Sequence, residues 1–208
     1  MVMPFRLVNA PATLQTRMNK ILREFLDHGV VLYLDDIQIY SENVDDHSNL
    51  DQKDLLLLEQ HDLAVSLKKS VSYEEQAEFL GYIVKTSGVT ISDRKVKSVQ
   101  NWVHPRWVKE VLILIGFANF YRRLIKGFTK VYKPITETLK GNPKDFHWGR
   151  EQEQAFEQLK TRFTTAPILS HFYPGTKIVV ETDASELALE CVLSQYERRG
   201  LHPVGLHS

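Results

Sequence analysis

The sequence predicts an α+β protein, and two observations carry that prediction. Several stretches of ten or more residues repeat apolar side chains at helical spacing, while shorter runs are rich in β-branched and aromatic residues. The two kinds of segment succeed one another without a regular strand–helix alternation. At 208 residues the chain can bury a sizeable core in one or two domains.

Each element is predicted from a local pattern. Helices are expected where apolar residues recur at helical spacing between an Asp, Ser or Pro start and a Gly or Pro end. Strands are expected where short β-branched or aromatic runs are bounded by turn residues. The predicted helices are 11–28, one that starts at Asp45 or Asp46 and carries Leu50 and 55–58, then 93–102, 109–125, 129–140 and 149–164. The predicted strands flank Asp35 and Asp36 and lie near 65–67 and 78–84, with 178–182 and 189–193 as a pair.

Composition excludes several classes of protein. No apolar run reaches the roughly 18 residues that predict a membrane span, and the run 111–118 is expected to be a buried helix. A single cysteine, Cys191, excludes an internal disulfide and a multi-cysteine zinc site. These features favour an intracellular protein, without distinguishing cytoplasm from nucleus.

The charges are unevenly distributed although the formal net charge is zero. Residues 35–62 contain nine acids and one base, whereas residues 85–133 contain eleven bases and two acids. A basic block of this kind is typical of contact with a phosphate backbone. The alternative is a solvated basic surface without a partner.

The most informative segment is VVLYLDDIQIY at residues 30–40, where two strand-favouring runs surround adjacent carboxylates. Asp35 and Asp36 fall where a tight turn must lie. Two neighbouring anions at the tip of a mostly buried hairpin are destabilising unless a cation offsets them, and hard divalent ions take such oxygen ligands. The simpler interpretation is a solvated turn, which an isolated Asp-Asp pair usually is.

Five motifs, in order along the chain, resemble the Pol polyprotein of Ty3/gypsy-type retrotransposons. YLDD at 33–36 is similar to the YxDD hairpin of a reverse transcriptase palm. MPFRLVNAPATLQ at 3–15 and EFLGYIV at 78–84 resemble the family's MPFGLxNAPATFQ and EFLGxxV segments. GFANFYRRLI at 116–125 resembles GLANYYRRFI, and TDAS at 182–185, followed by VLSQ at 192–195, resembles the opening of the tethered RNase H domain.

The resemblance implies a fold, an activity and a metal. Residues 1–86 would be a partial palm, 87–142 a helical thumb or connection, and 143–208 the truncated start of an RNase H-like domain. The parent reaction would be RNA-directed DNA synthesis from deoxynucleotides on an RNA/DNA primer-template duplex, with Mg²⁺. The family's third palm carboxylate lies upstream of the MPFGL segment. We therefore expect the isolated chain, as a fragment, to be inactive.

The resemblance also assigns site residues. The catalytic and metal-binding carboxylates would be Asp35 and Asp36 in the palm and Asp183 in RNase H. The nucleotide or template pocket would include Tyr33, Asn9, Pro11 and Gln15. The primer grip would be Phe79, Leu80 and Gly81, and nucleic-acid contacts would come from Arg122, Arg123 and Lys126.

Two departures and two alternatives remain. Arg6 stands where the family has glycine, and Glu190 replaces a glycine of the RNase H pattern. One alternative is a non-catalytic nucleic-acid-binding protein derived from a retroelement. The other is an assembly protein in which the apolar helix 111–125 meets a partner. The sequence does not give the oligomeric state.

Overall fold

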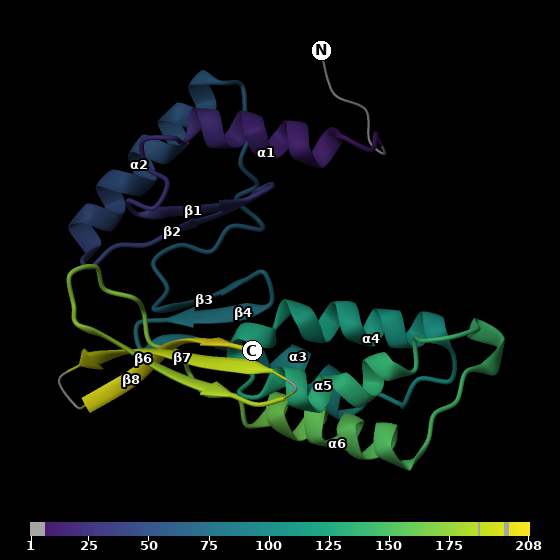
Figure 1. The fold of residues 1–208 in the computed structure, drawn as a ribbon. Coiled ribbons are helices and arrows are strands. Elements are labelled where there is room, and N and C mark those ends of the chain that lie inside the picture. The colour runs from purple at the N-terminus through teal and green to yellow at the C-terminus, as the bar shows by residue number, and fades with distance from the viewer. Residues whose placement is uncertain (1–6, 187, 198–199) are drawn as a thin grey trace. The chain divides into compact units, whose positions relative to one another are not determined.

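The computed structural model of the chain describes residues 7–186, 188–197 and 200–208. The chain divides into two compact units, Met1–Phe79 and Leu80–Ser208, which are described separately (Figure 1). Arg6 lies outside the described residues. No helix in the described part of the chain is long and apolar enough to cross a membrane.

The first unit is a β-hairpin that packs with two helices. Its core consists of Met18, Leu22, Val30 and Leu58, with half-buried apolar residues around them. The hairpin strands are antiparallel, with Val30 opposite Ile39. The elements of this unit are α1 (Ala10–Ile21), β1 (Val30–Tyr33), β2 (Asp36–Ile39), α2 (Val44–Gln60) and β3 (Gln76–Phe79).

Two predictions for the first unit were wrong. Helix α1 ends at Ile21, and the chain then folds back through turns in which the Val30 N–H donates to the Phe25 carbonyl at 3.1 Å. Leu22 and Phe25 still reach the core from this turn, so their spacing imitated a longer helix. Residues 65–67 form no strand, because Val65 lies beside the outer side of α2 instead of pairing with another chain segment.

The second unit combines helices and two antiparallel strand arrangements around one larger core. The buried residues come from α3, α4, α5 and α6, with contributions from β5 and β8. The regions predicted as 87–142 and 143–208 share this core. The elements are β4 (Tyr82–Lys85), β5 (Gly88–Ile91), α3 (Asp93–Gln100), α4 (Val108–Phe120), η1 (Arg122–Leu124), α5 (Phe128–Glu137), η2 (Pro143–Asp145), α6 (Arg150–Thr164), β6 (Ile178–Ala184), β7 (Leu189–Glu197) and β8 (Gly200–His207).

The C-terminal sheet has the order β6-β7-β8, and both neighbouring pairs are antiparallel (Figure 1). The predicted pairing of 178–182 with 189–193 is confirmed, whereas β5 and β8 were not predicted. The helix predicted over 109–125 is shorter than expected. It ends at Phe120, and a 3-10 turn, η1, carries Arg122 and Arg123.

Candidate active site and nucleic-acid interface

The carboxylate hairpin is confirmed. Tyr33 pairs with Asp36 across β1 and β2, so Leu34 and Asp35 form a two-residue turn. Asp35 and Asp36 are both exposed. The strand-favouring flanks and the tight turn therefore place the two carboxylates at the open tip of a rigid element.

The turn contains a strained residue that α1 supports. Leu34 has a φ of +55°, a left-handed conformation that costs a non-glycine residue roughly 1–2 kcal/mol. Its N–H donates to Gln15 Oε1 at 2.6 Å. The other end of this carboxamide, Nε2, donates to Asn19 Oδ1 at 2.8 Å. Because both ends of the Gln15 amide are engaged, α1 fixes the backbone immediately before Asp35.

The other predicted pocket residues lie in different positions. Tyr33 is 52% exposed on β1, next to the carboxylate turn. Asn9 and Pro11 are exposed at the start of α1, where Pro11 occupies the first turn of the helix. The structure therefore brings Gln15 to the hairpin tip. The roles of Asn9, Pro11 and Tyr33 toward a nucleotide stay predictions.

The hairpin tip suits a hard divalent ion in kind but does not complete a closed site. Asp35 and Asp36 present exposed carboxylate oxygens, which are the ligands that Mg²⁺ prefers. Within residues 7–186, 188–197 and 200–208, no group of three His, Cys, Asp or Glu side chains could hold a metal ion. The two carboxylates can therefore contribute to a metal site, and further ligands must come from water, substrate or other residues.

The predicted primer-grip residues form a second tight turn. Strand β3 ends at Phe79 and β4 begins at Tyr82. Leu80 and Gly81 have φ of +53° and +81°, the pattern of a type I′ turn. A Cβ at Gly81 would lie 2.5 Å from the Tyr121 hydroxyl, so glycine is required by packing as well as by conformation. A contact with a primer stays a prediction.

The three predicted basic residues differ in their availability. Arg122 is half-buried and donates to Asn119 Oδ1 at 3.5 Å and to the Ser208 carbonyl at 3.4 Å. Arg123 and Lys126 are exposed. Arg162 donates to the Lys126 carbonyl, which anchors the backbone and leaves the ammonium in solvent. Arg123 and Lys126 are therefore the members of this group that are most available to a phosphate backbone.

Asp183 lies near the end of β6 opposite Glu190 on β7. Lys130 Nζ lies 3.6 Å from Asp183 Oδ2 and 3.0 Å from Glu190 Oε1. The hydrogen bond with Glu190 is the main reason that the pKa of Lys130 is raised above its ordinary value. The departure at Glu190 thus places a second carboxylate beside Asp183, and a lysine offsets both charges.

One buried acid was not singled out by the sequence. Asp54 in α2 is 2% exposed, and its Oδ1 has no hydrogen-bond partner among the described residues. Burial, with a smaller contribution from the charge of Asp51, raises the pKa of Asp54 to about 6. Since Asp54 shares the core-facing side of α2 with Leu58, this carboxylate destabilises the first unit when it is ionised.

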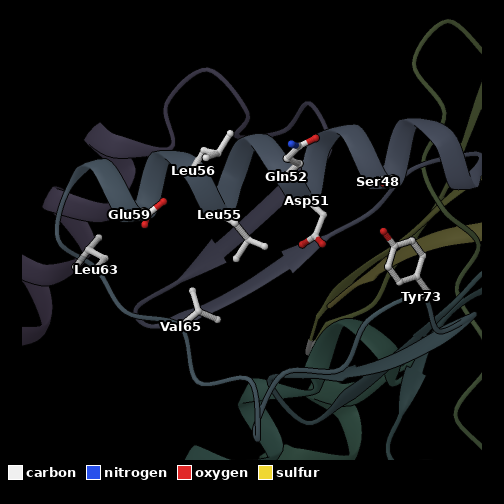
Figure 2. A pocket seen from close by; sticks show the side chains of 9 residues that line it. All are labelled: Ser48, Asp51, Gln52, Leu55, Leu56, Glu59, Leu63, Val65 and Tyr73. Carbon is white, nitrogen blue, oxygen red and sulfur yellow. The ribbon is translucent and has the colours of Figure 1, made fainter.

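An open hollow lies on the outer side of α2. Figure 2 shows Leu55 of the helix and Val65 of the following loop pointing toward one another, with Asp51 and Glu59 along the helix. None of the predicted site residues lines it. The acids on its wall make it unsuitable for a phosphate backbone. The complete lining is Ser48, Asp51, Gln52, Leu55, Leu56, Glu59, Leu63, Val65 and Tyr73.

Sequence reasoning also missed Leu34 and Lys130. Leu34 could have been suspected, because a two-residue hairpin turn needs a positive φ and neither Leu34 nor Asp35 is glycine. Lys130 had no local signal, since it approaches Asp183 only through the packing of α5 near the sheet.

Two family models match the chain on either side of its helical middle. Residues 1–84 match reverse transcriptase (RNA-dependent DNA polymerase), and residues 148–208 match the RNase H-like domain found in reverse transcriptase. Together with the hairpin and the C-terminal sheet, these matches define a polymerase palm segment followed by an RNase H-like segment.

Curated relatives narrow the family. The retrovirus-related Pol polyprotein from transposon 297 of Drosophila melanogaster is 39% identical over 93% of this chain, and the Tf2-3 transposon polyprotein of Schizosaccharomyces pombe is 32% identical over 100%. The chain therefore belongs to the reverse transcriptase family, in the form found in the Pol polyproteins of retrotransposons. It spans 18% and 16% of the length of these two relatives.

Solved structures agree with this assignment. A foamy viral protease-reverse transcriptase in complex with double-stranded DNA matches 98% of this chain and 36% of its own, with a TM-score of 0.83 and 24% identity, which shows the fold. The foamy viral enzyme in complex with an RNA/DNA hybrid has a TM-score of 0.79 at 25% identity, covering 98% of this chain and 27% of its own.

Proposed function

We propose that this chain carries the carboxylate hairpin and part of the duplex-binding surface of a Ty3/gypsy-type RNA-directed DNA polymerase. The hairpin geometry carries the proposal, because a rigid two-residue turn presents Asp35 and Asp36 together and exposed. The substrates would be deoxynucleotides and an RNA/DNA primer-template duplex. The intracellular location expected from the single cysteine belongs to the same proposal.

Asp35 and Asp36 would hold Mg²⁺, and Gln15 would keep their turn in register. When bound, Mg²⁺ would stabilise the charge that develops during phosphoryl transfer. The chain's own contribution is positional: Gln15 Oε1 holds the Leu34 N–H, so the following carboxylate is presented from a fixed backbone. Tyr33, exposed beside the turn, would contact the nucleotide or the primer end.

The metal proposal can be tested with Mn²⁺ as a paramagnetic probe of the 208-residue chain. Amide signals of residues 33–36 should broaden as Mn²⁺ is added, and the broadening should disappear in Asp35→Asn/Asp36→Asn. Asp45→Asn/Asp46→Asn is a matched control, because it removes an adjacent acidic pair from the first turn of α2. Equal broadening in both double variants would mean that the hairpin holds no metal.

Duplex binding is the second part of the proposal. The basic block supports it, and Arg123 and Lys126 are its exposed members next to η1. Arg123→Ala/Lys126→Ala should weaken binding similarly on every sequence and flatten the log–log salt slope by roughly one to two units, about one for each lost phosphate contact. Lys53→Ala, in the acidic segment, should change little. An unchanged slope in the double variant would show that these residues face solvent only.

Polymerase activity separates this proposal from its main alternative. We expect no template-directed primer extension by the isolated chain, because two-metal transfer needs more ligands than Asp35 and Asp36 provide. Extension that Asp35→Asn abolishes would contradict this expectation.

A non-catalytic nucleic-acid-binding protein is the alternative, and the basic block favours it equally. Metal-independent duplex binding without broadening at the hairpin would support that alternative. The assembly hypothesis for 111–125 loses part of its basis. Val111, Leu114 and Ala118 are buried within the second unit, although Leu112, Ile113 and Phe120 of α4 remain exposed.

A further inference from the structure

The sheet β6-β7-β8 has two unlike edges. On the β8 edge, the Ser170 N–H donates to the Pro203 carbonyl at 2.9 Å, and Pro203 itself has no N–H to offer. The pairing of β7 with β8 also shifts register between Leu193 and Ser194. A covering segment, a proline and a bulge are features that block the addition of another strand.

The β6 edge has none of these features. Among the described residues, the backbone hydrogen bonds of Ile178–Ala184 go to β7, and the strand contains no proline or glycine. Only Val179 is half-buried, and the other six residues are exposed. Ile178 and Val180 are 46% and 56% exposed on one face of the strand. Such an edge is a template for strand pairing.

We propose that a second copy of this chain pairs with β6 in antiparallel orientation, with the two-fold axis at Val180. In this register Lys177 of each copy lies opposite Asp183 of the other, and Ile178 lies opposite Thr182. The dimer thus contains two oppositely charged pairs beside a patch of Ile178 and Val180 from both copies. Cross-strand pairs of these kinds stabilise a sheet, typically by 0.2–1 kcal/mol each.

Other registers are less favourable. A two-fold axis perpendicular to the sheet keeps each copy's faces aligned, so only registers centred on a residue are possible. Centring on Glu181 would place that carboxylate opposite its own copy, which is destabilising. Centring on Val179 gives Lys177 an acid, Glu181, but the paired strand shortens to Ile178–Val180. The Val180 register pairs Ile178 through Thr182 without opposing like charges directly.

The neighbouring charges are compatible with this pairing. The Asp183 side chain is 73% exposed and lies 3.6 Å from Lys130, so it can lie between that lysine and the Lys177 of a second copy. Lys177 is exposed, and its Nζ lies 5.9 Å from the centre of the Tyr196 ring. The proposal is independent of polymerase chemistry, because it concerns the sheet edge alone.

Sedimentation velocity over a concentration series of the 208-residue chain tests the proposal. A species of twice the 24.1 kDa chain mass should accumulate with concentration. Val180→Lys places two like charges at the axis and should raise the dimer dissociation constant at least tenfold. Leu189→Lys is the matched control, since Leu189 is 74% exposed on β7 and lies away from the edge. A chain that stays monomeric throughout, or a dimer that Val180→Lys leaves intact, would overturn the proposal.

A charge exchange tests the register and does not depend on one variant. Lys177→Asp and Asp183→Lys should each weaken self-association, because each places like charges opposite one another. Mixed in equal amounts, these two variants should form a heterodimer, since both cross-strand pairs are then opposite in charge. Circular dichroism of each variant checks that it is folded. Dissociation by Leu112→Lys but not by Val180→Lys would instead assign the dimer to the exposed side of α4 and refute the β6 interface.

Discussion

The two units of the chain differ in how thoroughly they bury their interiors. In the described residues, the first unit has four fully buried apolar residues and one buried acid, Asp54, whereas the second has a cluster of seventeen. Both units place a leucine at positive φ in a tight turn, Leu34 and Leu80. The Leu34 turn is exposed and held by one side-chain hydrogen bond, while the Leu80–Gly81 turn lies against buried Tyr121. The comparison shows that the predicted catalytic turn belongs to the less stable unit.

The largest effect is expected in the core of the second unit. Phe156 is 1% exposed and contacts the Trp148 ring, so Phe156→Ala should lower the free energy of unfolding by roughly 3–5 kcal/mol through the cavity it leaves. All three tryptophans lie in this unit, so urea unfolding followed by tryptophan fluorescence isolates it. Phe120→Ala, at a 50% exposed site, is the control. Equal losses in both variants would mean that the second unit lacks a dominant core.

The second prediction concerns Asp54 and the pH dependence of the first unit. The folded state raises the pKa of Asp54 from 3.8 to about 6, so it binds a proton more tightly than the unfolded chain does. Ionisation therefore destabilises the first unit above about pH 6, by about 3 kcal/mol at pH 7, and the effect is relieved as pH falls toward 4.

Asp54→Leu should stabilise the first unit at pH 7 and remove most of this pH dependence. Hydrogen exchange of the 30–39 amides, compared between variant and parent at each pH, measures the difference. Asp45→Leu, at an exposed acid on the same helix, should not reproduce it. A parent chain that is more stable at pH 7 than at pH 5 would contradict the buried ionised carboxylate.

The third prediction separates conformation from packing at the second turn. Gly81→Ala should cost about 2 kcal/mol or more, because it combines a positive φ with a contact to the Tyr121 hydroxyl. Gly175→Ala is a matched control, since Gly175 has a φ of +85° and open space around it. The difference between the two losses, measured by urea unfolding, gives the packing contribution. Identical losses would show that Tyr121 moves aside freely.

The smallest effects are expected at the carboxylate turn. Gln15→Ala should cost about 1 kcal/mol, because the Leu34 N–H loses its acceptor. Leu34→Gly should recover a similar amount by removing the strain at positive φ. Hydrogen exchange at residues 33–36 measures both changes, with Thr16→Ala on the exposed side of α1 as control. Slower exchange at Leu34 in Gln15→Ala would refute the supporting role of Gln15.

The parts of the fold that depend on local patterns could be predicted from the sequence. The carboxylate hairpin, the amphipathic helix α6 and the β6–β7 pair follow from residue alternation, helical spacing and turn residues. Strand β8 could not be predicted, because it contains Pro203, Gly200 and Gly205 and is held by pairing with β7.

The site divides in the same way. Asp35 and Asp36 were located by their turn, whereas the contacts that define their surroundings join distant residues. Gln15 meets Leu34 nineteen positions later, and Lys130 meets Asp183 through the packing of α5. Local spacing contains no information about such contacts, so sequence reasoning could name Gln15 and Asp183 from the family resemblance but could not say what each of them touches.

The buried acid in α2 has a consequence for the lifetime of the protein in a cell. Each 1.4 kcal/mol changes an opening equilibrium about tenfold, so an ionised Asp54 at neutral pH would raise the open fraction of the first unit by roughly a hundredfold. An open first unit exposes the strands of residues 30–39 to proteases, and degradation follows the population of the open form when reclosing is fast. The abundance of the chain would then be set by one carboxylate in α2, far in sequence from the residues of the RNase H-like segment.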